Sequence, residues 1–285
     1  MIIQSKMSKN MSVQMREMGA AGKFYAARKG VLEREVAVFL ESAPEIPDLK
    51  QIFGIIVPND PYTYCAGVAA RAYRPLLDHD FDYVVVISPS HHVYFEEISV
   101  YNGNAYKTLL GEVPVATDIV AKLADQHTKI ISSQIGHESD EHGIEVQLPF
   151  LQHIFSDFKL VPIIMGNQDI ENITALSAAL ATVFRNKKAL FVASSNLSSN
   201  HPYERAAIAD KAAMDTIEKF DTKKLMRNFQ DDTLELSGGG AVISVLNACR
   251  ELGATKAQPL LYRSSGDMGA SKKRVTGYSS FLIHS

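Results

Sequence analysis

Five short apolar runs, rich in β-branched residues, are the feature that most limits the fold of this chain. They lie at residues 53–57, 83–88, 160–165, 190–194 and 275–282. Their apolar residues follow one another without regular alternation, which is typical of strands covered on both faces. Helical patterns separate them, at residues 65–78, 115–126, 144–155, 170–185, 202–219 and 240–252. This order predicts βαβ units and an α/β fold with a mostly parallel central sheet flanked by helices.

We interpret the 285 residues as a single domain, since no internal repeat or low-complexity linker divides them. The first 22 residues contain Lys6, Lys9 and Arg16 but no continuous apolar stretch. We therefore expect a mobile N-terminal segment and not a secretory signal. Residues 94–113, with Asn102-Gly103 as a turn signal, are expected to form a hairpin outside the main pattern.

Composition excludes several classes of function. A formal net charge of -3 gives no basic surface for nucleic acid. The longest apolar runs, such as 52–58 and 161–165, are too short to span a bilayer. The only two cysteines, Cys65 and Cys249, cannot build a disulfide framework and fit a reducing compartment. We therefore expect a cytoplasmic protein.

Polar residues follow the predicted strands, at the edge where α/β proteins bind ligands. The segments directly after the strands are 58–64, 88–92, 166–168 and 194–202. Another segment, 137–150, places two histidines and four carboxylates within 9 residues, directly before an amphipathic helix. These segments are where the chemistry of the protein is expected.

His91 and His92 end the second run, in Ser-Pro-Ser-His-His. Neighbouring side chains on an extended backbone point to opposite sides, so one of the two at most enters a shared site. Neutral imidazole can act there as a metal ligand or as a general base. The alternative is a histidine at a strand end that hydrogen-bonds a loop carbonyl.

Glu141, His142 and Glu145 form a second group. If a helix opens near Ile144, the spacing brings His142 and Glu145 to one face, with Glu141 one turn before Glu145. Such groups can bind a metal, or a carboxylate can orient a histidine through its second N–H. The alternative is an acidic first turn stabilised by the helix dipole, which gives His142 no role.

A glycine run within residues 236–248 opens the last predicted helix. Its backbone N–H groups could cradle an anion, with Ser237 as the N-cap. It does not match a phosphate-binding P-loop and contains no basic residue, so a turn that permits close helix packing is favoured. Ser195, Ser198 and Ser199 form no G-x-S-x-G elbow, so serine hydrolase chemistry has no local support.

These motifs, taken in order, resemble one known family. They are V-P-x-x-x-Y-T-Y-C (57–65), S-P-S-H-H (88–92), D-E-H-x-I-E-x-Q-L-P-F-L (140–151) and V-x-S-S-x-L-S (192–198). The chain resembles the Memo-like family, known in bacteria as protein B of the AmmeMemoRadiSam system, from Arg16 to the closing 275–283 strand. The resemblance implies a fold similar to class III extradiol dioxygenases, which use non-haem Fe(II) at the strand ends. It also implies AMMECR-type and radical-SAM proteins as possible partners.

Several positions depart from the family pattern. Where the family has its first metal-ligand histidine, this chain has Asn59, while His91 retains the second ligand. The third ligand, a cysteine, is replaced by Ser237, followed by Gly238. Asn196 and Ser199 stand in place of a family aspartate and histidine. A further histidine, His201, lies two residues beyond Ser199 and could take the place of the missing one.

The replacements remove strong ligands and charge. Amide and hydroxyl oxygens bind transition metals weakly compared with imidazole and thiolate. We therefore expect no cofactor, and a crevice that binds a small molecule or a protein partner through hydrogen bonds. The expected ligand contacts are Asn59, His92, Glu141, Asn196, Ser199, His201, Ser237 and Gly238.

Two enzymatic readings stay open. A metal-dependent redox or dioxygenase-like enzyme would bind Fe(II), Cu or Zn through His91, His142 and either Glu145 or Glu141, as a 2-His-1-carboxylate set. A metal-independent enzyme would use His91 or His142 as general base, with asparagines positioning the substrate. The catalytic candidates are thus His91, His142 and Glu145.

Overall fold

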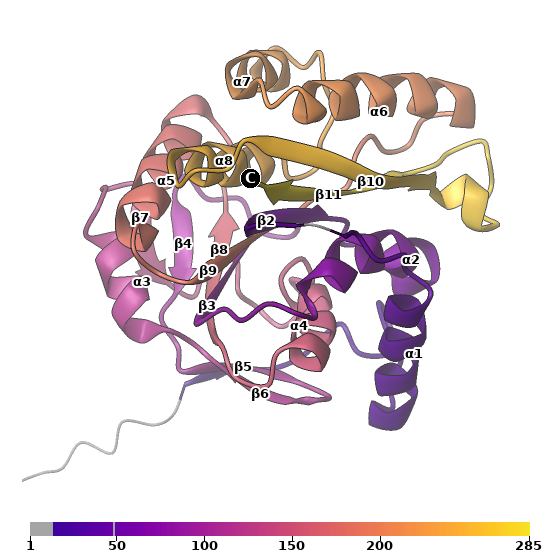
Figure 1. Ribbon diagram of the computed structural model, residues 1–285. Coiled ribbons are helices and arrows are strands. Elements are labelled where there is room, and N and C mark those ends of the chain that lie inside the picture. The colour runs from indigo at the N-terminus through magenta and orange to yellow at the C-terminus, as the bar shows by residue number, and fades with distance from the viewer. Residues whose placement is uncertain (1–13, 48) are drawn as a thin grey trace, which may run out of the picture.

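The protein is built around an eight-stranded sheet, which helices cover on both faces (Figure 1). The computed structural model describes residues 14–47 and 49–285. Residues 1–13, most of the segment that we expected to be mobile, lie outside the described residues. The strands are β1 (Met15–Arg16), β2 (Ile52–Val57), β3 (Tyr83–Pro89), β4 (Ile98–Tyr101), β5 (Ala105–Thr108), β6 (Gly111–Pro114), β7 (Ile130–Ser133), β8 (Lys159–Met165), β9 (Ala189–Ser194), β10 (Lys256–Ser264) and β11 (Gly277–His284).

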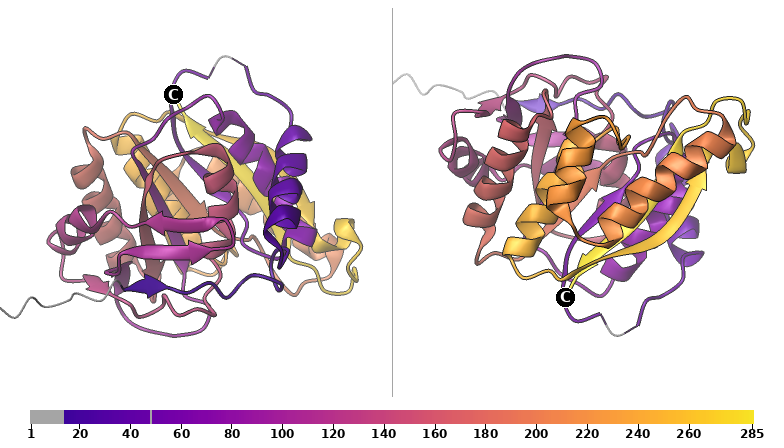
Figure 2. Two further views of the ribbon diagram at one scale, coloured as in Figure 1. Left: turned by 90° about the horizontal axis from the view of Figure 1, so that it is seen from below. Right: turned by 90° about the horizontal axis from the view of Figure 1, so that it is seen from above.

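The helices are packed in two layers. They are α1 (Lys29–Glu41), α2 (Tyr62–Tyr73), α3 (Thr117–Ala124), α4 (Leu148–Ile154), α5 (Ile170–Phe184), α6 (Tyr203–Glu218), α7 (Thr222–Gln230) and α8 (Gly239–Glu251), with short 3-10 turns η1 (Arg74–Leu76), η2 (Glu145–Gln147) and η3 (Ser265–Met268). Helices α1, α2 and α4 lie over one face of the sheet. Helices α5, α8 and α6 lie side by side over the other (Figure 2).

The middle of the sheet is parallel, as the apolar runs predict. The strand order is β10-β11-β2-β9-β3-β8-β4-β7, and β2, β9, β3 and β8 all run in one direction. These four strands are buried along nearly their whole length, because helices cover both faces. The predicted α/β fold is confirmed. Antiparallel pairs border this centre, where β11 joins β2 and β4 joins β8.

The hairpin is displaced from the position that the sequence predicted. Strand β4 belongs to the large sheet, between β8 and β7, because Ile98 and Val100 are fully buried there. The hairpin is instead β5–β6, in a small sheet with β1. Asn102-Gly103 turns the chain from one sheet into the other. A Cβ at Gly103 would lie 2.4 Å from the Tyr101 ring, so this close approach requires glycine.

The fold brings three loops to one edge of the sheet. The parallel strands β2, β3 and β9 end at Val57, Pro89 and Ser194, and their carboxyl ends lie next to one another. The loops that carry Asn59, His91 and Asn196 therefore meet, as the rule for open parallel sheets requires.

Candidate functional site

His91 is held at two points by one carboxylate. Its ring Nδ1 lies 2.7 Å from Oε1 of Glu141, and its backbone N–H donates to Oε2 of the same carboxylate at 2.7 Å. The backbone N–H of Gly143 donates to Oε1 at 2.9 Å. Both oxygens of Glu141 are thus engaged, and the histidine is fixed in backbone and ring together.

The charge of Glu141 sets the tautomer of His91. Burial alone would raise the pKa of Glu141, but hydrogen bonds from His91 and Gly143, with the charge of His91, lower it to about 2. The ionised carboxylate can only accept hydrogen bonds, so Nδ1 of His91 must donate. In the neutral ring, Nε2 then carries the lone pair.

His142 lies between two other rings. It stacks on Phe24, with centroids 4.1 Å apart and planes inclined by 16°, and its other neighbour is His91 at 4.3 Å. The exposed His92 meets it edge-on at 6.2 Å. Burial first, then the nearby charge of His91, lowers the pKa of His142 to about 4, so its ring is neutral at pH 7.

Glu145, a predicted catalytic candidate, is bound by the N-terminal segment. Its fully buried carboxylate accepts hydrogen bonds from the guanidinium of Arg16, from the backbone N–H groups of Gly19 and Ala20 at 2.9 and 3.0 Å, and from the Tyr25 hydroxyl at 2.6 Å. Both of its oxygens are occupied on the side of the N-terminal segment. It therefore anchors this segment, and with it Phe24, and lies outside the group formed by His91, Glu141 and His142.

Arg16 connects this anchor to the site. Its second guanidinium nitrogen donates to the backbone carbonyl of Glu141, and its guanidinium carbon lies 5.1 Å from the Tyr106 ring centroid. The Tyr106 hydroxyl in turn lies 2.5 Å from Nδ1 of the buried His137. Burial lowers the pKa of His137 to about 3, so this ring is neutral. Arg16, packed against Tyr106, thus holds the loop that carries Glu141 in place.

The positions of Asn59, Asn196 and Ser237 adjoin one another, as the resemblance implies. The backbone N–H of Asn59 donates to Oδ1 of Asn196 at 3.0 Å, and that of Asn196 donates to the Ser237 hydroxyl at 2.8 Å. Asn59 is fully buried, and among the described residues its side-chain oxygen and nitrogen have no partner. A Cβ at Gly238 would lie 2.7 Å from the Ser194 carbonyl oxygen, which supports the close-packing interpretation of the glycine run.

Ser199 and His201 lie farther out. Ser199 is exposed and shares a shallow depression with Ser237 and Glu235. Nε2 of His201 lies 2.8 Å from both carboxylate oxygens of Glu235. The structure thus pairs His201 with a surface carboxylate and gives it no contact with His91.

Hydrogen bonds connect the 140–151 segment to the ends of β2 and β9. They involve three residues that the sequence analysis did not single out, Gln147, Ser194 and Gly143. Gln147 donates to the Pro58 carbonyl at 2.9 Å and to the Ser194 hydroxyl at 3.1 Å, and Ser194 donates to the Gly143 carbonyl at 2.6 Å. A Cβ at Gly143 would lie 1.9 Å from the Ser88 hydroxyl. In the sequence, the one indication of these contacts is Gln147 itself, a polar residue with apolar neighbours in a stretch that was predicted to be helical.

Comparison with known proteins decides the family. The family model described as Memo-like protein matches residues 16–282. The chain belongs to the Memo-like family. It is 34% identical over 276 residues to a MEMO1 family protein of Methanosarcina mazei, covering 95% of this chain and 100% of the relative. A MEMO1 family protein of Nitrosopumilus maritimus is 29% identical over 269 residues, or 93% of this chain and 98% of that one.

A solved structure supports the fold alone. The crystal structure of an uncharacterised protein from Escherichia coli superposes with a TM-score of 0.52 and 13% sequence identity, over 81% of this chain and 99% of that one. Within the described residues, no helix is long and apolar enough to cross a membrane.

The positions that the resemblance assigns to a metal hold mostly weak donors in this Memo-like protein. The three family positions supply one imidazole, from His91, with an amide at Asn59 and a hydroxyl at Ser237 that already accepts from a backbone N–H. Both oxygens of the neighbouring Glu141 are engaged as well. Oε1 accepts two hydrogen bonds and Oε2 only one, so Oε2 keeps a lone pair, and ligand atoms of His91, Glu141 and His142 lie within 4.8 Å of one another. His91 and His142 remain as the strong donors of this group.

The Arg16–Glu145 pair predicts a large loss of stability in Glu145→Gln. Removing one partner of a buried ion pair leaves an uncompensated charge, at a cost of about 3–5 kcal/mol. Urea unfolding measures it. The matched control is Lys107→Gln, which breaks the exposed pair with Glu17 in the same segment and should cost less than about 1 kcal/mol. Equal small losses in both variants would show that the anchor contributes little.

The low pKa of His142 predicts a pH-dependent stability. In the unfolded chain His142 is protonated below its ordinary pKa of 6.5, whereas in the folded protein it stays neutral down to about pH 4. The free energy of unfolding therefore decreases as the pH falls through this interval. His137 contributes in the same direction. His142→Phe keeps a ring on Phe24 but removes the titrating group. Urea unfolding at about pH 7 and about pH 4.5 should show a smaller loss in the variant than in the unchanged protein.

Proposed function

We propose that this Memo-like protein binds a small, uncharged polar molecule in the strand-end crevice and that His91 accepts a proton there without help from a metal. The observation that carries the proposal is the two-point contact of Glu141 with the ring and the backbone of His91. A catalytic histidine needs a fixed tautomer and orientation, and a buried carboxylate on Nδ1 supplies both.

The roles of the neighbouring groups follow from their contacts. Glu141 orients the ring and stabilises the imidazolium that forms when Nε2 takes a proton. Phe24 and the neutral His142 supply an apolar, stacked wall beside it. Asn59 holds an amide with spare donor and acceptor capacity on the same edge of the sheet.

The absence of a free cation in this group favours an uncharged ligand. Among the described residues near His91, the Arg16 guanidinium is the buried positive charge, and Glu145 with the Glu141 carbonyl engages it. An anionic ligand would therefore meet the charge of Glu141 without compensation. Polar, neutral groups that accept or donate hydrogen bonds suit the crevice best.

The tautomer of His91 tests the arrangement directly. Two-dimensional ¹⁵N–¹H spectra of the imidazole nitrogens, taken at alkaline pH, should show His91 protonated on Nδ1. Glu141→Gln keeps the size of the side chain but removes its charge, and it should shift His91 toward a mixture of tautomers. A signal protonated on Nε2 in the unchanged protein would contradict the proposal.

His91→Ala should leave the fold intact, because the side chain sits at the edge of the crevice, 22% exposed, and its loss opens no core cavity. The free energy of unfolding should fall by no more than about 1–3 kcal/mol, the cost of taking one hydrogen bond from the buried carboxylate of Glu141. Thermal and urea unfolding measure it. A loss of several kcal/mol would instead make His91 a structural residue.

A metal-dependent enzyme is the second candidate, because ligand atoms of His91, Glu141 and His142 lie within 4.8 Å of one another. Thermal unfolding of metal-stripped protein, recorded anaerobically with Fe(II), Cu(I) or Zn(II), separates the two. We expect no rise in Tm. A ligand at 100 times its Kd adds about 2.7 kcal/mol, or a rise of about 5–10 °C. A rise of that size, lost in His91→Ala, would establish a rebuilt metal site.

We also propose AMMECR-type and radical-SAM proteins as partners and the cytoplasm as the location. Both rest on family membership and on the composition of the chain. Co-purification of the intact protein with either partner from its own cells tests the first.

A further inference from the structure

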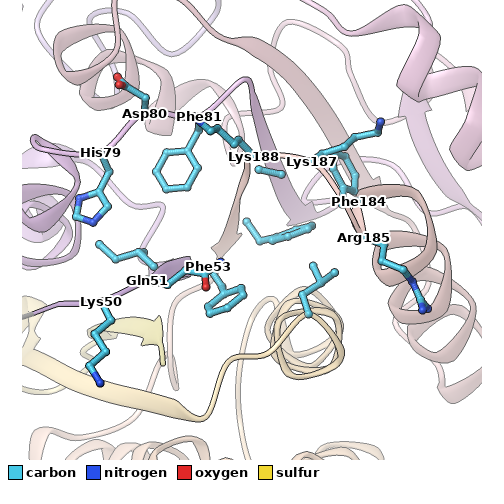
Figure 3. Close-up of a pocket in the computed structure, with 14 residues that line it drawn as sticks. Lys50, Gln51, Phe53, His79, Asp80, Phe81, Phe184, Arg185, Lys187 and Lys188 are labelled. Atoms are coloured by element: carbon cyan, nitrogen blue, oxygen red, sulfur yellow. The ribbon is translucent and has the colours of Figure 1, made fainter.

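A second cavity lies at the opposite end of the same central strands. It has a volume of about 260 Å³ and is bounded by residues at the starts of β2, β3 and β9 (Figure 3). The loop that carries His91 lies beyond the carboxyl ends of these strands. Strand β2 has 6 residues, so at about 3.3 Å per residue the two sites are roughly 20 Å apart. The cavity is therefore independent of His91.

Aromatic rings form its inner wall. Phe184 and Phe191 are almost fully buried and meet edge-on with centroids 5.4 Å apart. Phe53 and the half-buried Phe81 complete the lining, and Figure 3 shows their rings facing the inside of the cavity. A wall of this kind favours a flat apolar group, because aromatic rings bury large areas and stack at low entropic cost.

Basic side chains surround this aromatic wall. Lys50, Arg185, Lys187 and Lys188 line the cavity together with one carboxylate, Asp80. Figure 3 shows Lys50 and Arg185 at the periphery, where their flexible stems leave the charged ends in solvent. No ion pair within residues 14–47 and 49–285 includes any of these four. The rim is thus positive on a chain whose net charge is -3.

We propose that this cavity binds a small aromatic carboxylate. The ring of the ligand packs against Phe53, Phe184 and Phe191, and its carboxylate points outward to the basic rim. The volume of about 260 Å³ lies just below the range for drug-sized ligands, about 300–1,000 Å³, which suits a single ring with a short acidic arm. A bare inorganic anion would leave the aromatic wall unfilled, and a neutral aromatic molecule would gain nothing from the rim.

Phenylacetate and phenylacetamide are the probes, since they share a ring and differ in charge. Backbone amide shifts of the full-length ¹⁵N-labelled protein locate each one. We expect phenylacetate to shift Gln51, Ala189 and Leu252, and to bind about three- to tenfold more tightly than phenylacetamide. Removing two of the four positive charges of the rim in Arg185→Gln/Lys188→Gln should reduce this preference while leaving binding of the amide unchanged.

The matched control is Lys273→Gln/Arg274→Gln, which removes the same charge from exposed positions. These residues lie just before β11, toward the carboxyl end of β2 and away from the cavity. It should keep the preference for the acid. Equal affinity for acid and amide, shifts confined to the His91 loop, or the same loss of preference in the control would each overturn the proposal. Unchanged Tm in both double variants shows that they fold.

Discussion

The candidate site depends on one buried carboxylate, that of Glu145. Four donors from Arg16, Gly19, Ala20 and Tyr25 converge on it, and the same guanidinium reaches the carbonyl of Glu141. A buried ion is tolerated only when its lone pairs are satisfied in this way. Because the anchor joins the N-terminal segment to the loop after β7, it fixes the position of Glu141. Through Glu141 it also sets the orientation of His91.

Much of the fold could be predicted because the signal was local. The continuous apolar runs correspond to β2, β3, β8, β9 and β11, and the strand-end rule led directly to His91. The predicted hairpin was wrong because its strands are decided by contacts between residues far apart in the sequence. Asn102-Gly103 is a valid turn signal, but the burial of Ile98 and Val100 in the large sheet decided which strands it joins. Strand β1, with only 2 residues, is too short to carry a pattern of its own.

The roles of Glu141 and Glu145 show the same limit within the site. The two glutamates are four residues apart in one segment. Spacing alone therefore made either of them the candidate carboxylate of a metal site with His142. Their difference comes from residues more than a hundred positions away, since Arg16 engages Glu145 and leaves Glu141 for His91. The buried amide of Asn59, by contrast, lies where the motif order placed it. The sequence named candidate residues for the site, and only the folded chain shows which of them are in contact.

The stack of Phe24 on His142 gives the region before α1 a significance beyond packing. This region contributes the ring that stacks on His142 and all four donors to Glu145, but only the two residues of β1 to any sheet. A proteolytic cut between Tyr25 and α1 would therefore spare every strand of the eight-stranded sheet, yet once the cut piece dissociated the buried carboxylate of Glu145 would lose all four of its donors.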